Sequence, residues 1–469
     1  MPQGAAKAPV KADGSPAAIE AEIPGLGTRR LAVHLIQSVL WAGRPLDDAL
    51  ADTERRPHFH ALEARDRAFA HAIAATVLRR RGSLEMVLAK FIEKPLPDAA
   101  RIAHAILLAA AAQILVMGTP VHAAINLAVA QCQRERPASR YDKLANAVLR
   151  RVARDGPAML AACDTVVLDT PGWLLASWKA AYGQATARAI AAASLAEAPL
   201  DLAVKDAGSA AEWADRLGGR LLAGGSIRLS GDHARVEDLP GFAEGAWWVQ
   251  DQAAQLPARL LGDVAGLEVA DLCAAPGGKT AELAARGAQV TAVDQSARRL
   301  ERLTANVTRL GLHSRVTVVA ADVAQWQPGR QFDAVLLDAP CTATGTIRRH
   351  PDILHLKRET DSARLAILQG RLLAAAAALV KPGGQLVYGV CSLEPEEGEG
   401  VVAAFLAEHP AFVRVPIVAE DLGGALASQW ITAVGDLRTL PCHSVAVGSD
   451  SLPALTGMDG FYAARFARS

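Results

Sequence analysis

The chain has 469 residues, of which 51% are apolar and 21% charged, and its formal net charge is zero. This composition is typical of a folded globular protein and excludes a largely disordered one. At about 150 residues per domain, the length predicts about three domains. Residues 1–150 nevertheless hold 20 Lys and Arg against 14 Asp and Glu. This local excess indicates either a polyanionic partner or ordinary solvated helix faces.

Residues 1–25 have no apolar core, so we expect a flexible tail and not a secretory signal. The apolar run over residues 103–117 is shorter than the about 20 residues that span a bilayer. Six cysteines are present, without a CxxC pair or a His/Cys cluster of zinc spacing, which predicts free thiols and no metal site. We therefore expect a cytoplasmic protein without membrane contact, and nothing in the pattern demands more than a monomer.

Residues 26–156 show apolar side chains at helical spacing, as in Leu31, Leu35 and Val39, with short Gly- and Pro-containing connections. This pattern predicts an all-helical bundle, in which the charged segment 43–58 is a loop between helices. Residues 157–246 mix a helical stretch with short extended pieces at 200–204, 221–222 and 227–229. They predict a small α+β linker domain.

From residue 247 to 469, short apolar runs alternate with helical stretches. The runs cover residues 267–272, 289–294, 316–321, 334–338 and 385–391. Such alternation predicts an α/β domain with a mostly parallel, doubly wound, Rossmann-like sheet. Ligands of these sheets bind at the carboxyl ends of the strands, so the residues there are candidate site residues.

The first of these strands leads into the sequence DLCAAPGGKT, residues 271–280. Its small residues and two glycines let the backbone approach a ligand at a helix N-terminus. The G-x-G-x-x-G fingerprint of nicotinamide dinucleotide sites is absent. Asp294 ends the second strand and Asp322 follows the third, where a carboxylate can accept hydrogen bonds from ribose hydroxyls. The alternative is that both aspartates only cap helices.

Two cysteines follow neighbouring strands, Cys341 in the sequence DAPC and Cys391 in YGVC. Pro340 restricts the backbone on either side, which holds Asp338 and Cys341 on a turn. Two thiols beside a carboxylate at the mouth of a sheet indicate a covalent mechanism. The alternative is a pair of packed thiols, the usual state of a free cysteine.

The motifs DLCAAPGGKT, AVDQS, AADV, LLDAPCTATGTIRRHPD and YGVCSLEPEE resemble, in this order, those of RNA cytosine-5 methyltransferases. Residues 245–256 resemble the lead-in of the same enzymes. The helical front, with ARDRAFAHAI and residues 146–150, resembles the NusB-like RNA-binding domain. The combination resembles the RsmB (Sun, Fmu) branch, which modifies small-subunit ribosomal RNA, and it covers nearly the whole chain after the tail.

This resemblance implies that S-adenosylmethionine is the cofactor and RNA the partner. The implied cofactor-binding residues are Cys273, Ala274, Ala275, Pro276, Gly277, Gly278, Lys279, Asp294, Asp322 and Asp338. Cys391 would be the nucleophile and Cys341 would assist product release. Asp338 would hydrogen-bond nitrogen 3 of the cytosine and Lys279 would lower the pKa of a thiol.

The target base would have to be flipped out of its stack. Arg348, Arg349 and His350 follow the DAPC turn and would hold the RNA backbone, unless they form a solvated loop.

The chain departs from the family pattern at three places. Val390 stands where a threonine is usual and Gly398 where an asparagine is usual, and neither change removes a group that the chemistry needs. Residues 202–205 read LAVK instead of LRVN, which could alter an RNA contact.

Three alternatives to a ribosomal RNA methyltransferase stay open. One is a NusB-like assembly protein with an inactive methyltransferase domain, although Cys341, Cys391, Asp338 and Lys279 are all intact. Another is a nicotinamide-dependent oxidoreductase, which would leave the two thiols unexplained. The last keeps the chemistry and changes the substrate to transfer RNA.

Overall fold

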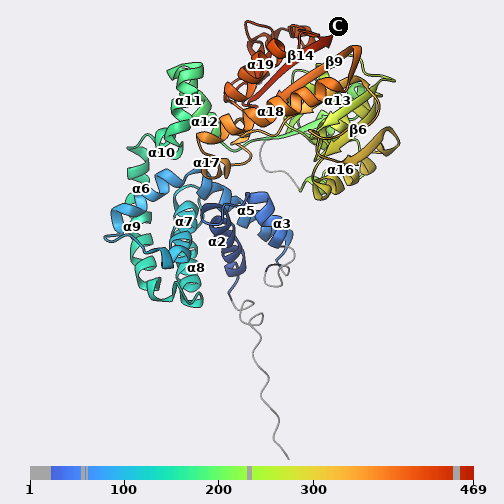
Figure 1. Cartoon of the computed structure of the whole chain (residues 1–469). Helices are drawn as coiled ribbons and strands as arrows, with labels where there is room; N and C mark the ends of the chain where they lie inside the picture. Colours follow the sequence, from blue (N-terminus) through green and yellow to red (C-terminus); the bar gives the residue numbers. More distant parts are fainter. Residues whose placement is uncertain (1–22, 54–58, 60–61, 230–234, 447–454) are drawn as a thin grey trace, which may run out of the picture. The chain divides into compact units, whose positions relative to one another are not determined.

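The computed structural model describes residues 23–469 apart from 54–58, 60–61, 230–234 and 447–454, so most of the predicted tail lies outside the described residues. The chain divides into two compact units, Met1–Asp169 and Thr170–Ser469 (Figure 1). Each unit has its own core and is described by itself.

Unit 1 is a helical bundle, as predicted. Its helices are α2 (Leu26–Leu40), α3 (Leu46–Thr53), α5 (Ala64–Arg79), α6 (Arg81–Phe91), α7 (Arg101–Leu115), α8 (Val121–Arg134), α9 (Asp142–Ala161) and α10 (Thr165–Asp169). The prediction of a loop over 43–58 was wrong, because α3 lies within this segment. Leu46 and Ala49 of α3 are buried, and Asp47 and Asp48 lie in its first turn, where the helix dipole favours negative charge.

Helix α7 forms the centre of the bundle and is longer than the apolar run suggested. The 3₁₀ turn η1 (Asp98–Ala100) leads into it without a break. The resulting window, Asp98–Leu115, is long and apolar enough to cross a membrane by length and composition alone. However, 61% of this window is buried inside the unit, which is the pattern of a core helix.

The end of unit 1 lies beyond the predicted boundary after residue 156, which falls inside α9. Helix α9 continues through Gly156 and Pro157. Helix α10 then packs on α6, where Asp169 accepts hydrogen bonds from the backbone N and Oγ of Ser83 at 2.6 and 3.0 Å. The division of the remaining chain into a linker and a sheet domain stays a prediction, since both belong to one compact unit.

Unit 2 begins with α11 (Gly172–Tyr182) and α12 (Gln184–Ser194), followed by a small antiparallel sheet in the order β2-β3-β1-β4. Its strands are β1 (Leu200–Val204), β2 (Arg220–Leu221), β3 (Ile227–Leu229) and β4 (Trp247–Val249), with α13 (Ala210–Leu217) between β1 and β2. Leu202, Ile227 and Trp247 form its core. The three predicted extended pieces are thus strands, β2 being displaced by one residue.

The large sheet has the strand order β10-β14-β9-β8-β5-β6-β7, with β11 paired to β14. Its strands are β5 (Glu268–Leu272), β6 (Gln289–Asp294), β7 (Val316–Ala320), β8 (Phe332–Asp338), β9 (Val380–Val390), β10 (Phe412–Arg414), β11 (Leu437–Thr439) and β14 (Phe461–Arg468). Strands β5 to β9 are parallel, which confirms the predicted doubly wound sheet. The antiparallel edge of β10, β11 and β14 was not predicted.

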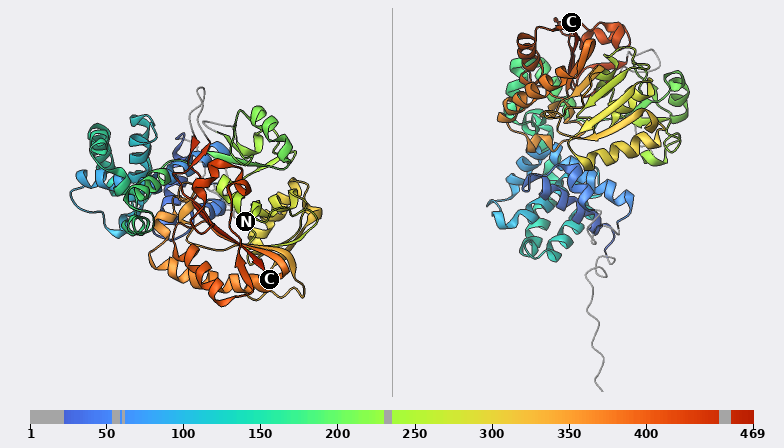
Figure 2. Two further views of the ribbon diagram at one scale, coloured as in Figure 1. Left: turned by 90° about the horizontal axis from the view of Figure 1, so that it is seen from above. Right: turned by 45° about the vertical axis from the view of Figure 1, so that its right-hand side comes forward.

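Helices cover both faces of this sheet (Figure 2). Helices α14 (Gln252–Arg259), α15 (Gly278–Ala285) and α16 (Ala297–Arg309) contribute to one core, and α18 (Thr360–Ala378) and α19 (Val401–Glu408) to the other. Along β5, Val269 faces the first core while Ala270 and Leu272 face the second. The carboxyl ends of β5, β8 and β9 therefore meet at one edge, which carries the candidate site.

Candidate active site

The loop after β5 bends across the end of β6. The backbone N of Ala274 donates to the carbonyl of Val293 at 3.0 Å, and the N of Ala275 donates to Asp294 Oδ2 at 3.2 Å. Gly277 caps α15 at a φ of 103°, and a Cβ there would lie 2.7 Å from the side chain of Leu303. Glycine is therefore required for this close approach of backbone to α16.

A cavity of about 460 Å³ lies against this loop, a size that suits a small-molecule ligand. Residues 274–279 form one wall, Asp271 and Asp338 contribute carboxylates from the strand ends, and Trp248 closes another side. The structure thus brings together Ala274, Ala275, Pro276, Gly277, Gly278, Lys279 and Asp338 of the predicted cofactor residues.

Cys273, Asp294 and Asp322 do not line this cavity. Asp294 is buried behind the loop, where it also accepts from the N of Ser296 at 2.9 Å. Ser296, not Asp294, is the N-cap of α16. Asp322 is exposed and accepts from the N of Ala324 at 3.0 Å, forming a turn. A cofactor role of these three residues stays a prediction.

One carboxyl group at the cavity suits a cationic part of a ligand such as S-adenosylmethionine. Asp271 is fully buried, and its Oδ1 has no hydrogen-bond partner, while its Oδ2 accepts from the hydroxyl of Thr280 at 2.5 Å. Burial raises the pKa of Asp271 to about 7. A positively charged ammonium or sulfonium group would compensate an ionised Asp271, so the residues present fit this cofactor.

Lys279 and Asp338 form an ion pair, with 2.7 Å between Nζ and Oδ2. Burial alone would lower the pKa of Lys279, but the charge and hydrogen bond of Asp338, together with Cys391 and Asp271, outweigh burial and raise the pKa, so the side chain is a cation. Its Nζ also lies 5.0 Å from the centre of the Phe461 ring. The pair links the loop after β5 to the end of β8.

The two predicted thiols meet beside this ion pair. The sulfur atoms of Cys341 and Cys391 lie 3.4 Å apart, and both residues are half-buried. The hydrogen bond with Cys391, together with burial, raises the pKa of Cys341 well above its ordinary value. Cys341 therefore holds its proton strongly, and either sulfur can be the donor in this contact.

The two turns that carry the thiols are bonded to each other. The N of Ala339 donates to the carbonyl of Gly389 at 2.9 Å, and the N of Gly345 donates to the carbonyl of Cys391 at 3.0 Å. A Cβ on Gly345 would lie 2.0 Å from the carbonyl oxygen of Gly460, so no larger residue fits at this crossing. These backbone contacts join the two turns on the side of the strand ends and of Gly460.

Sequence reasoning missed Glu397, a fully buried carboxylate behind the thiols. It accepts from the N of Thr342 and from Gln369 Nε2, each at 2.9 Å. It also accepts from the hydroxyls of Thr342 and Ser392, the latter at 2.5 Å. The acidic run after Cys391 was a signal, but the sequence does not tell that, of its four glutamates, Glu394 and Glu397 are the buried ones.

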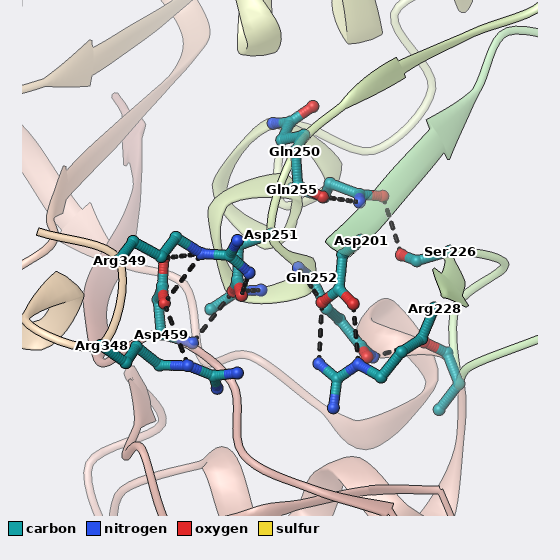
Figure 3. Close-up of polar contacts among 12 residues, drawn as sticks. Asp201, Ser226, Arg228, Gln250, Asp251, Gln252, Gln255, Arg348, Arg349 and Asp459 are labelled. Carbon is teal, nitrogen blue, oxygen red and sulfur yellow. Dashed lines mark hydrogen bonds and ion pairs between the residues drawn. The ribbon is translucent and has the colours of Figure 1, made fainter. Parts of the chain in front are cut away.

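The prediction that Arg348 and Arg349 hold RNA or form a solvated loop was wrong. Arg348 is 4% exposed and pairs with Asp459 at 3.9 Å. Arg349 pairs with both Asp459, at 3.1 Å, and Asp251 (Figure 3). The partners lie 98 and 110 positions away along the chain, so the local sequence could not indicate them. His350 is exposed at the cavity, and its RNA contact stays a prediction.

Two of the three departures from the family pattern, Val390 and Lys205, have structural explanations. Val390 is fully buried in the core beneath α18. Lys205 donates from Nζ to the carbonyl of Leu310 at 3.1 Å, at the end of α16. Among the described residues, no group of three or more His, Cys, Asp or Glu side chains could hold a metal ion.

A seven-strand order with β14 inserted antiparallel between β9 and β10, and with a glycine-containing ligand loop after β5, defines a class I S-adenosylmethionine-dependent methyltransferase. Residues 259–467 match the family model of the 16S rRNA methyltransferase RsmB/F, and residues 27–154 match that of the NusB family.

The chain is 37% identical to ribosomal RNA small subunit methyltransferase B of Xanthomonas campestris, over 95% of this chain and 98% of that protein. It is 36% identical to the protein of the same name from Vibrio cholerae, over 93% and 96%. The crystal structure of PH0851 has the same fold, with a TM-score of 0.71 and 23% identity over 95% of this chain and 99% of that one. The chain therefore belongs to the RsmB/F methyltransferase family.

Proposed function

We propose that this protein transfers a methyl group to carbon 5 of a cytosine in small-subunit ribosomal RNA through a covalent adduct with Cys391. The observation that carries the proposal is the 3.4 Å contact between the sulfurs of Cys391 and Cys341, beside the Lys279–Asp338 ion pair. Relatives over nearly the whole chain are named as ribosomal RNA small subunit methyltransferases, which supports this substrate.

Carbon 5 of cytosine is a weak nucleophile, and a cysteine can activate it. The thiolate of Cys391 forms a bond to carbon 6, and the electron pair of the 5,6 double bond moves toward carbon 5. S-adenosylmethionine, when bound, supplies an electrophilic methyl group to that carbon. A base, for which solvent water suffices, then takes the carbon-5 proton. The electron pair of that bond restores the 5,6 double bond, the carbon–sulfur bond breaks, and Cys391 leaves as a thiolate.

The other side chains control protons and charge in these steps. Asp338 lies at the mouth of the sheet, where its carboxyl group, once it carries or shares a proton, would donate a hydrogen bond to nitrogen 3 of the cytosine. The positive charge of Lys279 acts on the sulfur of Cys391, which carries negative charge when it attacks and when it leaves. Cys341, which holds its proton, would hydrogen-bond the sulfur of Cys391 as this sulfur leaves carbon 6, and so assist product release.

The helical unit matches the NusB family, and this supports an RNA partner for the same chain. We expect it to bind ribosomal RNA and to present one cytosine, flipped out of its stack, to the thiol site. Work on ribosomal RNA implies a cytoplasmic location.

The deciding experiment measures transfer of labelled methyl from S-adenosylmethionine to unmodified small-subunit ribosomal RNA. Wild type should yield 5-methylcytosine and Cys391→Ala should yield none. Cys163→Ala, which changes a partly exposed cysteine of the helical unit, is the matched control and should behave as wild type. Label on transfer RNA only would change the substrate, and no transfer to any RNA by wild type would favour a non-catalytic assembly role.

A further inference from the structure

We infer that Glu397 is a positioning residue that clamps the two thiol turns together and so sets the geometry in which Cys341 and Cys391 act on one base. The inference rests on the proposed function. It adds a residue that neither touches the reacting atoms nor belongs to the ligand loop.

The clamp is built on the residues that follow the cysteines. Cys341 is followed by Thr342 and Cys391 by Ser392, and the two hydroxyls lie 3.0 Å apart. Glu397 Oε2 accepts from both hydroxyls, and Oε1 accepts from the N of Thr342 at 2.9 Å. A single carboxylate therefore binds the position next to each thiol, in two segments that are 50 residues apart.

Glu397 is itself fixed in place by burial and by a hydrogen bond to its backbone carbonyl. Its side chain is fully buried, as are those of Thr342, Ser392 and Gln369. Its own carbonyl accepts from the hydroxyl of Tyr388 at 2.6 Å. It lies in a π-helical turn, Glu396–Gly400, a rare conformation that is frequent at functional sites.

The donors to the carboxylate are the neutral N–H and O–H groups of Thr342, Ser392 and Gln369. A carboxylate can be buried only when such bonds replace its water, so all of them are needed together. If the carboxylate is lost, the hydroxyls of both turns lose their common acceptor. Each sulfur belongs to the residue just before one of those hydroxyls, so a shift of the turn would also move the sulfur. A misplacement of about 1 Å can lower a catalytic rate about 100-fold.

The test compares Glu397→Gln with Glu396→Gln, the same chemical change one residue earlier, at an exposed position of the same turn. Glutamine keeps the size and one acceptor oxygen. In either orientation of its amide, however, the NH₂ faces donors, either the two hydroxyls or the N–H groups of Thr342 and Gln369. We expect the single-turnover rate of methyl transfer by Glu397→Gln to fall about 100-fold. The KM values for RNA and S-adenosylmethionine should stay unchanged, and Glu396→Gln should match wild type.

A second measurement needs no RNA. Alkylation of Cys341 by iodoacetamide is followed against pH by peptide mass spectrometry. The carboxylate of Glu397 is one of the groups that raise the pKa of Cys341, so Glu397→Gln should move the alkylation profile to lower pH, and Glu396→Gln should not. A loosened fold would also lower the pKa of Cys341, because burial raises it, so the profiles are compared only if Glu397→Gln and Glu396→Gln have equal urea midpoints.

If Glu397→Gln fails to fold, Ser392→Ala takes its place in the test. This variant removes only one donor to the carboxylate, so we expect a smaller fall in the rate of methyl transfer. The inference is overturned if Glu397→Gln matches Glu396→Gln in both rate and alkylation profile. If the wild type transfers no methyl to cytosine, the proposed function fails, while the alkylation profiles still decide whether Glu397 acts on the thiols.

Discussion

The sulfur atoms of Cys341 and Cys391 lie 3.4 Å apart, although the two residues are 50 positions apart in the sequence. The contact follows from the sheet, because β8 and β9 are parallel neighbours in which Asp338 pairs with Gly389. Both strands therefore end at the same level, and each leads directly into a cysteine turn. Two thiols so close together can act on the same base in successive steps.

The first prediction separates the roles of the two thiols. In Cys341→Ala the nucleophile remains but the group that assists its departure is lost. We expect this variant to accumulate a protein–RNA adduct that survives denaturing electrophoresis when S-adenosylmethionine and ribosomal RNA are present. Cys391→Ala and the double variant should form none, because no carbon–sulfur bond can form. An adduct in Cys391→Ala and none in Cys341→Ala would reverse the assignment.

The second prediction concerns Gly398, one of the three departures from the family pattern described above. A Cβ at this position would lie 2.7 Å from Arg438 Nη2 and 2.9 Å from the Tyr462 ring. Both side chains are buried, so Gly398→Asn should lower the free energy of unfolding by about 1–3 kcal/mol. Urea denaturation measures this. Gly400→Ala is the control, since its Cβ would meet only the carbonyl of Pro395, at 3.4 Å. Equal midpoints for Gly398→Asn and wild type would contradict the packing argument.

The parallel strands and their ligand-facing ends could be predicted because the signal for each lies within one short segment of the sequence. Each is a short apolar run that ends in a small, acidic or sulfur-containing residue, as at Asp294 and before Cys391. The antiparallel strand β14 ends the chain and carries Arg465 and Arg468 among its apolar residues. Its pairing with β9 depends on a partner about 75 positions away, as Tyr462 opposite Val390 shows, and no local signal marks it.

The same limit explains which site residues were missed or misjudged. Glu397 looks like its neighbours Glu396 and Glu399, and only the packing of the π-helical turn selects it as the buried one. Arg349 looks like part of a basic loop until Asp251 and Asp459 come together around it. The sequence predicts the chemistry of a single motif. It does not predict the side chains that position or neutralise the motif's residues, because these come from distant segments.

The third prediction tests the buried ion pairs of Arg349. Arg349→Ala would leave Asp251 and Asp459 buried without their shared cation (Figure 3). Breaking a buried pair from one side costs about 3–5 kcal/mol, and we expect a loss of that order in the free energy of unfolding. The matched control is Arg358→Ala at an exposed position, which should change the urea midpoint little. A loss confined to RNA binding, without loss of stability, would restore the RNA-contact role that the structure contradicts.

The last prediction concerns the pH dependence of stability and Asp271. Burial raises its pKa in the folded protein to about 7, from an ordinary value of 3.8. Between these two values the folded protein binds a proton that the unfolded chain has released. The stabilisation that comes from protonated Asp271 is therefore complete below about pH 4 and is lost as the pH rises through 7.

Asp271→Asn keeps an oxygen that can accept from Thr280 but cannot ionise, so it should remove this dependence. We expect the urea midpoint of the variant, relative to wild type, to rise between pH 5 and pH 8 in the absence of S-adenosylmethionine. Asp263→Asn, at an exposed position in the loop before β5, should give a constant difference over the same range. If the curves of wild type and Asp271→Asn run parallel from pH 5 to pH 8, Asp271 is ionised in both the folded and the unfolded protein over this range. The folded protein then stabilises the buried carboxylate without a cationic ligand.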